Sequence, residues 1–205
     1  MAVLTALFAT VLLMGLGLSI ALIGSTEATL GAQDAAARAL RHASLAGVHL
    51  AVADLRLQPS WSVVLAPGPV MPLSRAPGRA IPATLAPPAP WNGSPLDLVV
   101  MTADVQAAAD TRIGDPQAWR LFEAGSLDAL VPGVAAGPWY LAVWVADDGA
   151  DGDGDPSIDS NGVICLRAVA FGPRDARVAT AVSVAKTVVA GAPDGVRILT
   201  VRPAS

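Results

Sequence analysis

The sequence is poor in cysteine and in aromatic residues. It contains one cysteine in 205 residues, so no disulfide can form within the chain, and aromatic residues make up only 4% of it. Cys165 stands in an apolar, strand-like run, where a cysteine usually behaves as a small buried hydrophobe. Because 53% of the residues are hydrophobic while aromatics are scarce, the core must be built mainly from small aliphatic side chains.

Motifs of catalysis and of nucleic-acid binding are also missing. The chain has no G-x-S-x-G elbow, no phosphate-binding glycine loop and no paired metal-binding histidine motif. Its net charge is −4, and six of its 17 acids lie in one short segment, residues 147–159. An enzyme is therefore the least expected class, and nothing in the sequence indicates a nucleic-acid surface.

Charge and proline are absent from the first 24 residues. The only polar side chains of this run are Thr5, Thr10 and Ser19. As a helix the run would be about 36 Å long, which is enough to cross a hydrocarbon core of about 30 Å. A helix that is apolar on every side has no use in a water-soluble protein. The sequence therefore predicts a transmembrane helix over residues 1–24.

A cleaved signal peptide is the other explanation of an apolar N-terminal run. This run exceeds the usual apolar stretch of about 7 to 15 residues, and no basic residues precede it. We therefore expect a retained anchor, with Met1 either the mature start or the initiator.

Residues 25–57 contain no proline and place small and apolar side chains near one face. This pattern predicts an amphipathic helix. Because nothing forces a break at Gly24, we expect one helix from about residue 2 to about residue 57, roughly 80 Å long.

Residues 58–138 differ in composition from the helical segment before them. Ten of the 17 prolines fall in residues 58–95, which excludes regular secondary structure over most of that stretch. Its large apolar residues favour packing against a domain over a flexible linker; they are Trp61, Val63, Val64 and Trp91. Residues 96–101 suggest a short strand. Residues 115–124 suggest a short helix with Asp115 as its N-cap, Pro116 at its first position and Gly125 as its terminator.

The C-terminal region, residues 139–205, has a clear β pattern. Four β-rich runs are separated by turn signals, at residues 139–146, 162–171, 177–189 and 196–202. The simplest arrangement is a four-stranded antiparallel meander with one side packed on the helix of residues 34–57. The expected fold class is thus α+β, with a long N-terminal helix whose C-terminal half packs on a four-stranded antiparallel sheet.

An acidic loop connects the first two of these runs. Hard oxygen ligands at every second residue suit Ca²⁺, which takes about six to eight of them. The loop is not an EF-hand: counted from Asp151, its sixth position is Pro156 and its twelfth is Gly162. A solvated acidic hairpin loop is the alternative. The candidate Ca²⁺ ligands are Asp147, Asp148, Asp151, Asp153, Asp155, Asp159 and Asn161.

Three segments together resemble the type IV pilin-like superfamily. They are the apolar start AVLTALFATVLLMGLGLSIALIGSTEA, the continuation AARALRHASLAGVHLAVADLR and the block VWVADDGADGDGDPSIDSNGVICLRAVAFGP. Within the superfamily the chain is similar to minor pilins of the PilX-type N-terminal class and to related minor pseudopilins of secretion systems.

The resemblance implies a filament subunit. It implies that the apolar helix half holds the subunit in the bacterial inner membrane before assembly. The same half then forms the core of a cell-surface, extracellular or periplasmic filament. The implied partners are other pilin subunits and the pilus assembly machinery, and several relatives bind calcium in loops of the β region.

Two departures from the family pattern bear on this expectation. Members usually carry Glu at the fifth mature position, where this chain has Thr5 if Met1 is the mature start, and no helix-kinking proline precedes Pro59. Loss of that glutamate is similar to minor subunits at a filament tip. The residues that we expect to serve assembly are Thr5, Leu12, Gly15, Gly17, Ala21 and Gly24, the small ones by allowing close helix approach.

Two other functions stay open at this point. A single-pass, membrane-anchored extracytoplasmic binding module would use the proline-rich stretch as a stalk. It predicts that the helix ends near Gly24. A major structural subunit is disfavoured by Thr5.

Overall fold

The computed structural model describes residues 2–66, 84–85, 95–110, 118–131, 133–134, 137–187 and 195–204. The chain divides into two compact units, Met1–Ala39 and Leu40–Ser205.

The helix α1 runs from Ala2 to Leu55, through every glycine of the apolar run. The first unit consists of its residues up to Ala39, and the large apolar side chains there are exposed to solvent. Its few hydroxyl groups donate hydrogen bonds back to the helix: Ser19 Oγ donates to the Gly15 carbonyl at 2.9 Å. An apolar helix that satisfies its own polar groups suits a lipid environment. The prediction of one helix through Gly24 is confirmed, and the helix ends two residues earlier than expected.

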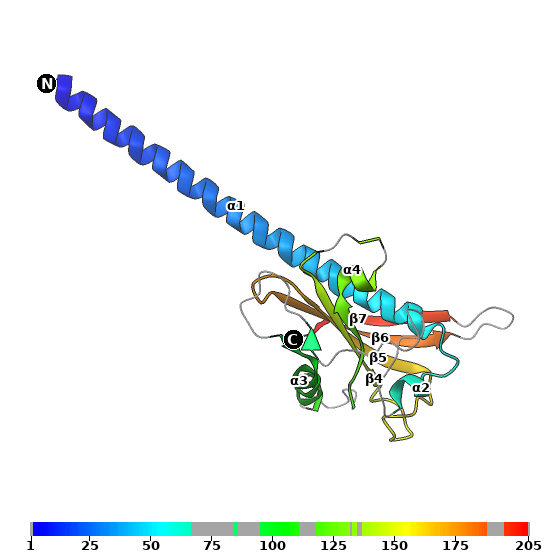
Figure 1. Cartoon of the computed structure of the whole chain (residues 1–205). Coiled ribbons are helices and arrows are strands. Elements are labelled where there is room, and N and C mark those ends of the chain that lie inside the picture. Colours follow the sequence, from blue (N-terminus) through cyan, green and yellow to red (C-terminus); the bar gives the residue numbers. More distant parts are fainter. Residues whose placement is uncertain are drawn as a thin grey trace. The chain divides into compact units, whose positions relative to one another are not determined.

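The second unit is built on an antiparallel sheet of five strands (Figure 1). Neighbours in the sheet follow the chain order: β3 (Arg120–Ser126), β4 (Tyr140–Asp147), β5 (Val163–Phe171), β6 (Arg177–Thr187) and β7 (Gly195–Ala204). The predicted meander is therefore correct for β4 to β7.

The prediction of four strands is wrong by one strand, because β3 was predicted as part of a helix. Asp115 and Pro116 lie outside the described residues, but Arg120–Ser126 pairs with β4, with a bulge at Phe122. Phe122 on this strand is 1% exposed. Sheet pairing and burial of Phe122 override the local helix preference, which is a weak determinant of structure.

The last turns of α1 cover one face of the sheet. Val48, Ala51 and Leu55 pack there with buried side chains of β5 and β6, such as Leu166 and Val182. Small residues permit a close approach: a Cβ on Gly47 would lie 3.3 Å from a methyl group of Leu141. Buried Ser44 anchors the contact, since its hydroxyl donates to the Ala168 carbonyl at 3.0 Å.

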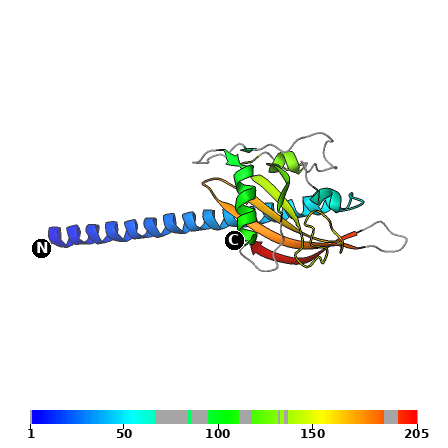
Figure 2. The same ribbon diagram turned by 90° about the horizontal axis from the view of Figure 1, so that it is seen from below.

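The helix α3 (Leu98–Asp110) covers part of the opposite face, so the sheet lies between two helices (Figure 2). Leu98 and Val105 pack there with Trp144, whose indole nitrogen donates to Thr102 Oγ1 at 2.8 Å.

The predicted strand over residues 96–101 is largely wrong. Only β2 (Leu96–Asp97) is extended, paired with β1 (Thr84–Leu85), and the chain then enters α3. The cause is a helix cap: Asp97 Oδ1 accepts hydrogen bonds from the Val99 and Val100 amides at 2.9 and 3.0 Å.

Two short helices complete the described structure, α2 (Ser62–Leu65) and α4 (Leu127–Leu130). The expectation that the proline-rich region packs on the domain is confirmed for Trp61 and Val64, which are buried, whereas Val63 is exposed. Trp91 and most of the prolines lie outside the described residues. Cys165 is buried, as expected.

Candidate metal site

The acidic loop joins β4 to β5 at one end of their ladder. The last pair of that ladder is Asp147 with Ile164, so Asp147 belongs to the strand and the other carboxylates belong to the loop. The backbone turns at Gly154 and Gly162, whose φ angles of 73° and 74° favour glycine. The ladder thus fixes Asp147 in place and the loop folds back over it.

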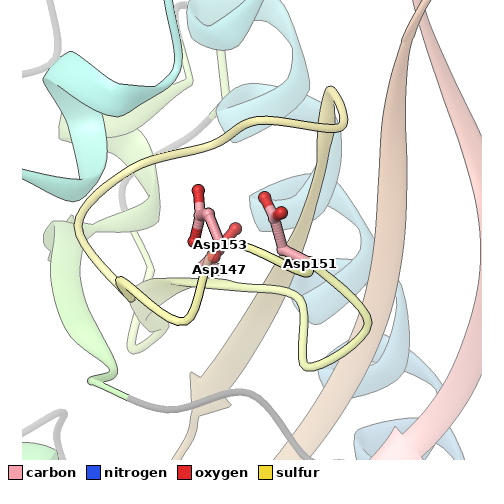
Figure 3. A group of neighbouring side chains, drawn as sticks. All are labelled: Asp147, Asp151 and Asp153. Atoms are coloured by element: carbon pink, nitrogen blue, oxygen red, sulfur yellow. The ribbon is translucent and has the colours of Figure 1, made fainter.

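Three carboxylates meet inside this loop. One oxygen each from Asp147, Asp151 and Asp153 lies within 4.8 Å of the others, and Figure 3 shows the three side chains gathered within the loop. They line a cavity of about 220 Å³ together with other residues of the loop. Oxygen donors around a small cavity are the surroundings that hard divalent cations prefer. This cluster could bind a metal ion.

Asp147 is the group that most requires a partner. Its side chain is 5% exposed, and its Oδ1 has no hydrogen-bond partner within the described part of the chain. Burial raises the pKa of Asp147 to about 7, opposed in part by the Asp148 amide and increased further by the nearby charge of Asp151. A buried carboxylate oxygen without a partner is costly, and a bound cation would remove that cost.

The next carboxylate of the cluster, Asp151, is held in its ionised form. Its Oδ2 accepts a hydrogen bond from the Ser160 amide at 2.8 Å, and the Ser160 hydroxyl donates to its Oδ1. These bonds lower the pKa of Asp151. In the same way Ser157 lowers the pKa of Asp155.

The other predicted ligands hold the turns of the loop. Asp148 accepts from the Asn161 side-chain amide at 2.8 Å, and Asp159 accepts from the Gly162 amide at 2.7 Å. Burial raises the pKa of Asp159. The structure therefore brings three of the seven predicted ligands together. The other four fix the loop around them: Asp148, Asp155, Asp159 and Asn161.

Sequence reasoning missed the serines that orient the loop. Ser160 holds Asp151, and Ser62 of α2 accepts a hydrogen bond from the Asp159 amide at 3.1 Å. Ser160 lies within the acidic loop, between Asp159 and Asn161, where serine is a common turn-forming residue. The contact of Ser62 spans 97 positions of sequence and leaves no local signal.

The residues predicted to serve assembly lie together on the exposed part of α1, away from this loop in sequence. An added Cβ on Gly15, Gly17 or Gly24 would meet nothing within 4 Å. The segment around them is long and apolar enough to cross a membrane, so it could anchor the protein there or act as a signal sequence.

The chain matches no protein-family model, no curated protein and no solved structure. A long apolar N-terminal helix followed by an antiparallel sheet fits a pilin-like architecture.

The raised pKa of Asp147 predicts how the stability of the metal-free protein depends on pH. The unfolded chain loses this proton near pH 3.8 and the folded chain near pH 7, so the folded state binds more protons between these values. Stability from this group is therefore fully present below about pH 4 and is lost as the pH rises to about 7.

We expect the melting temperature in chelator to fall between about pH 4 and pH 7, and the gain from added Ca²⁺ to grow over the same range. Thermal melts of the full chain in detergent, with chelator or with Ca²⁺, measure both. A calcium gain that is as large at pH 5 as at pH 8 would contradict this account of Asp147.

Proposed function

We propose that the protein is a minor structural subunit of a type IV pilus-like filament, of the PilX-type N-terminal class or a related minor pseudopilin. The observation that carries the proposal is the continuity of α1. One helix from Ala2 to Leu55 begins as a bare apolar segment and ends packed on an antiparallel sheet. A filament subunit needs such a helix, because the apolar part must serve two environments in succession.

In this function the apolar half of α1 first anchors the subunit in the bacterial inner membrane. On assembly it leaves the lipid and packs against the helices of other pilin subunits. Its exposed small residues allow backbones to approach closely, which is how helices associate without a hydrophobic driving force; they are Gly15, Gly17, Ala21 and Gly24. The proposed position is at or near the tip of the filament, and Thr5 in place of the usual glutamate supports it if Met1 is the mature start.

The metal of the acidic loop is, in this proposal, Ca²⁺. Every side chain of the cluster offers carboxylate oxygens, and Ca²⁺ accepts irregular sets of about six to eight oxygens, whereas Mg²⁺ demands near-ideal octahedral geometry. The ion joins the end of β4 to the loop that covers it, in a chain whose single cysteine forms no internal disulfide. Its role is structural, and the protein is not an enzyme.

The second candidate is a single-pass, membrane-anchored binding module that never enters a filament. The compact second unit, Leu40–Ser205, favours it, because such a unit could act alone at a membrane surface. The two functions differ in what α1 touches outside the membrane.

Cysteine cross-linking in filament-forming host cells tests the proposal. The variants Gly15→Cys and Ala21→Cys place a thiol on the apolar part of α1, while the native Cys165 is buried. We expect oxidative cross-links to another pilin subunit, recovered in sheared filaments. Thr29→Cys, beyond the apolar run on the same helix, is the matched control for cross-linking that does not depend on the apolar run. A protein that stays in the membrane fraction without such cross-links, while filaments form normally, is a binding module.

A further inference from the structure

The described elements cover only part of the sheet face that carries α3. The helix packs on side chains of β4 and β5, including Trp144 and Phe171. Further across the sheet, β6 presents small, half-buried side chains, and those of β7 on this face are largely exposed. The surface of this open part is formed by Ala179, Ala181, Ser183 and Ala185.

The strand register brings four arginines to this open face. Arg167 of β5 and Arg202 of β7 both lie opposite Ala181, on its two sides. Arg177 shares the parity of Ala181 along β6, and Arg197 lies opposite Ala185, so both point the same way. We call Arg167, Arg177, Arg197 and Arg202 the arginine face.

A β-bulge creates this arrangement. Arg197 and Arg202 are five positions apart, and in a regular strand they would point to opposite faces. The register of β7 shifts between Ser183 and Val184 of its partner, which leaves Leu199 without an opposite residue. The extra residue turns both arginines to the same side.

The arginines form three levels along β6. Arg177 itself lies at the first level. Arg167 and Arg202 lie at the second level, beside Ala181, and Arg197 lies at the third, beside Ala185. Each level is four residues of β6 from the next. At about 3.3 Å per residue the levels are about 13 Å apart and span about 26 Å. A small anion would reach one level only, whereas an extended acidic chain of about eight residues would reach all three.

Three of these arginines are exposed: Arg177, Arg197 and Arg202. Among the residues that the structure describes, Arg177, Arg197 and Arg202 form no ion pair. The three strands contribute no acidic side chain to the face, and Asp104 of α3 is the acid nearest to it among the residues of the adjoining hollow.

A hollow of about 410 Å³ adjoins the arginine face, between α3 and the sheet. Met101, Val105 and Val169 give it an apolar lining, and Arg167 and Arg177 also line it. An apolar side chain inserted there would lie directly beside two of the cations. Apolar anchors beside charged contacts are typical of protein interfaces.

We propose that the arginine face binds an extended acidic segment of a partner protein, with one apolar side chain of that segment in the hollow. The open part has alanine and serine where sugar or nucleic-acid sites carry stacking aromatics. A second copy's acidic loop fits less well, because its carboxylates hold turns through bonds such as Asp151 to Ser160 and Asp148 to Asn161. This inference does not depend on whether the protein enters a filament.

The test uses the full chain in nanodiscs of uncharged lipid. The probe is a fluorescent peptide of about ten residues with Glu at every fourth position and one Leu, which matches the spacing of the levels. We expect binding that weakens with salt, and about tenfold weaker binding by Arg177→Ala/Arg202→Ala, which removes two exposed cations. Arg38→Ala/Arg41→Ala removes the same charge from α1 and should bind as the native chain does.

Further binding measurements distinguish an acidic protein segment from other possible ligands of the arginine face. A peptide with Ser in place of Leu should bind at least about threefold more weakly, because it leaves the hollow empty. Equal binding by the two double variants overturns the proposal. So does tighter binding of heparin or single-stranded DNA than of the peptide, or self-association of the native chain that Arg177→Ala/Arg202→Ala abolishes.

Discussion

Replacing Asp147 with asparagine is expected to change the stability of the metal-free and the calcium-loaded protein in opposite directions. The metal-free variant should melt at a higher temperature than the native chain at pH 8. There the native chain buries a charge whose Oδ1 has no hydrogen-bond partner in the described structure, and an amide costs less to bury than a charge. The calcium-loaded variant should melt at a lower temperature, because the buried ligand of the ion is gone.

The expected size of the loss follows from linkage. Calcium at about 100 times its dissociation constant stabilises the folded state by about 2.7 kcal/mol. In a domain of this size that corresponds to a rise in melting temperature of about 5 to 10 °C. We expect Asp147→Asn to abolish most of this rise, measured by thermal melts of the full chain in detergent with Ca²⁺ and with chelator.

The control for Asp147→Asn is Asp175→Asn. Asp175 lies exposed in the turn between β5 and β6 at a φ of 59°, a conformation that asparagine tolerates well. It removes the same charge from a turn outside the loop, so its calcium response should equal that of the native chain. If Asp147→Asn lowered stability in chelator and kept the calcium response, Asp147 would be a structural residue and the metal site would lie elsewhere.

The parts of the fold that the sequence predicts are those with a local pattern. The continuous helix follows from the absence of proline before Pro59, and β4 to β7 follow from β-rich runs between turn signals. The strand β3 could not be found in this way, because its residues are extended through pairing with β4, a contact between distant parts of the sequence. The helix α3 was missed for a different reason: Asp97 is a good N-cap, but the apolar run after it also suits a strand.

The candidate metal site was also predicted only in part. The spacing of aspartates predicts an acidic cluster, but the sequence gives all seven oxygen-bearing residues equal weight. Only the ladder between β4 and β5 shows that Asp147 is buried and that Asp151 and Asp153 reach it. The arginine face has no sequence signal, since the parity of Arg197 and Arg202 would separate them without the bulge at Leu199.

The function of α1 can be tested with a single charge. Leu12 lies exposed in the middle of the apolar run, and arginine at the centre of a membrane helix costs about 2.5 to 3.5 kcal/mol of insertion free energy. Leu12→Arg is therefore expected to lower the equilibrium constant for membrane insertion about 70-fold to 400-fold. The measurement is the share of the protein that resists alkaline extraction from membranes, followed by its share in sheared filaments.

The matched control for Leu12→Arg is Leu30→Arg, the same substitution on the same helix. Leu30 is also exposed, but it lies beyond Glu27 and close to Asp34, where the helix already carries charge. An arginine there should leave insertion unchanged, since it lies outside the apolar run. Normal insertion and assembly of Leu12→Arg would exclude the apolar run as anchor and as filament core. Normal insertion of Leu30→Arg without assembly would instead extend the filament contact beyond Gly24, along the part of α1 that leads toward the sheet.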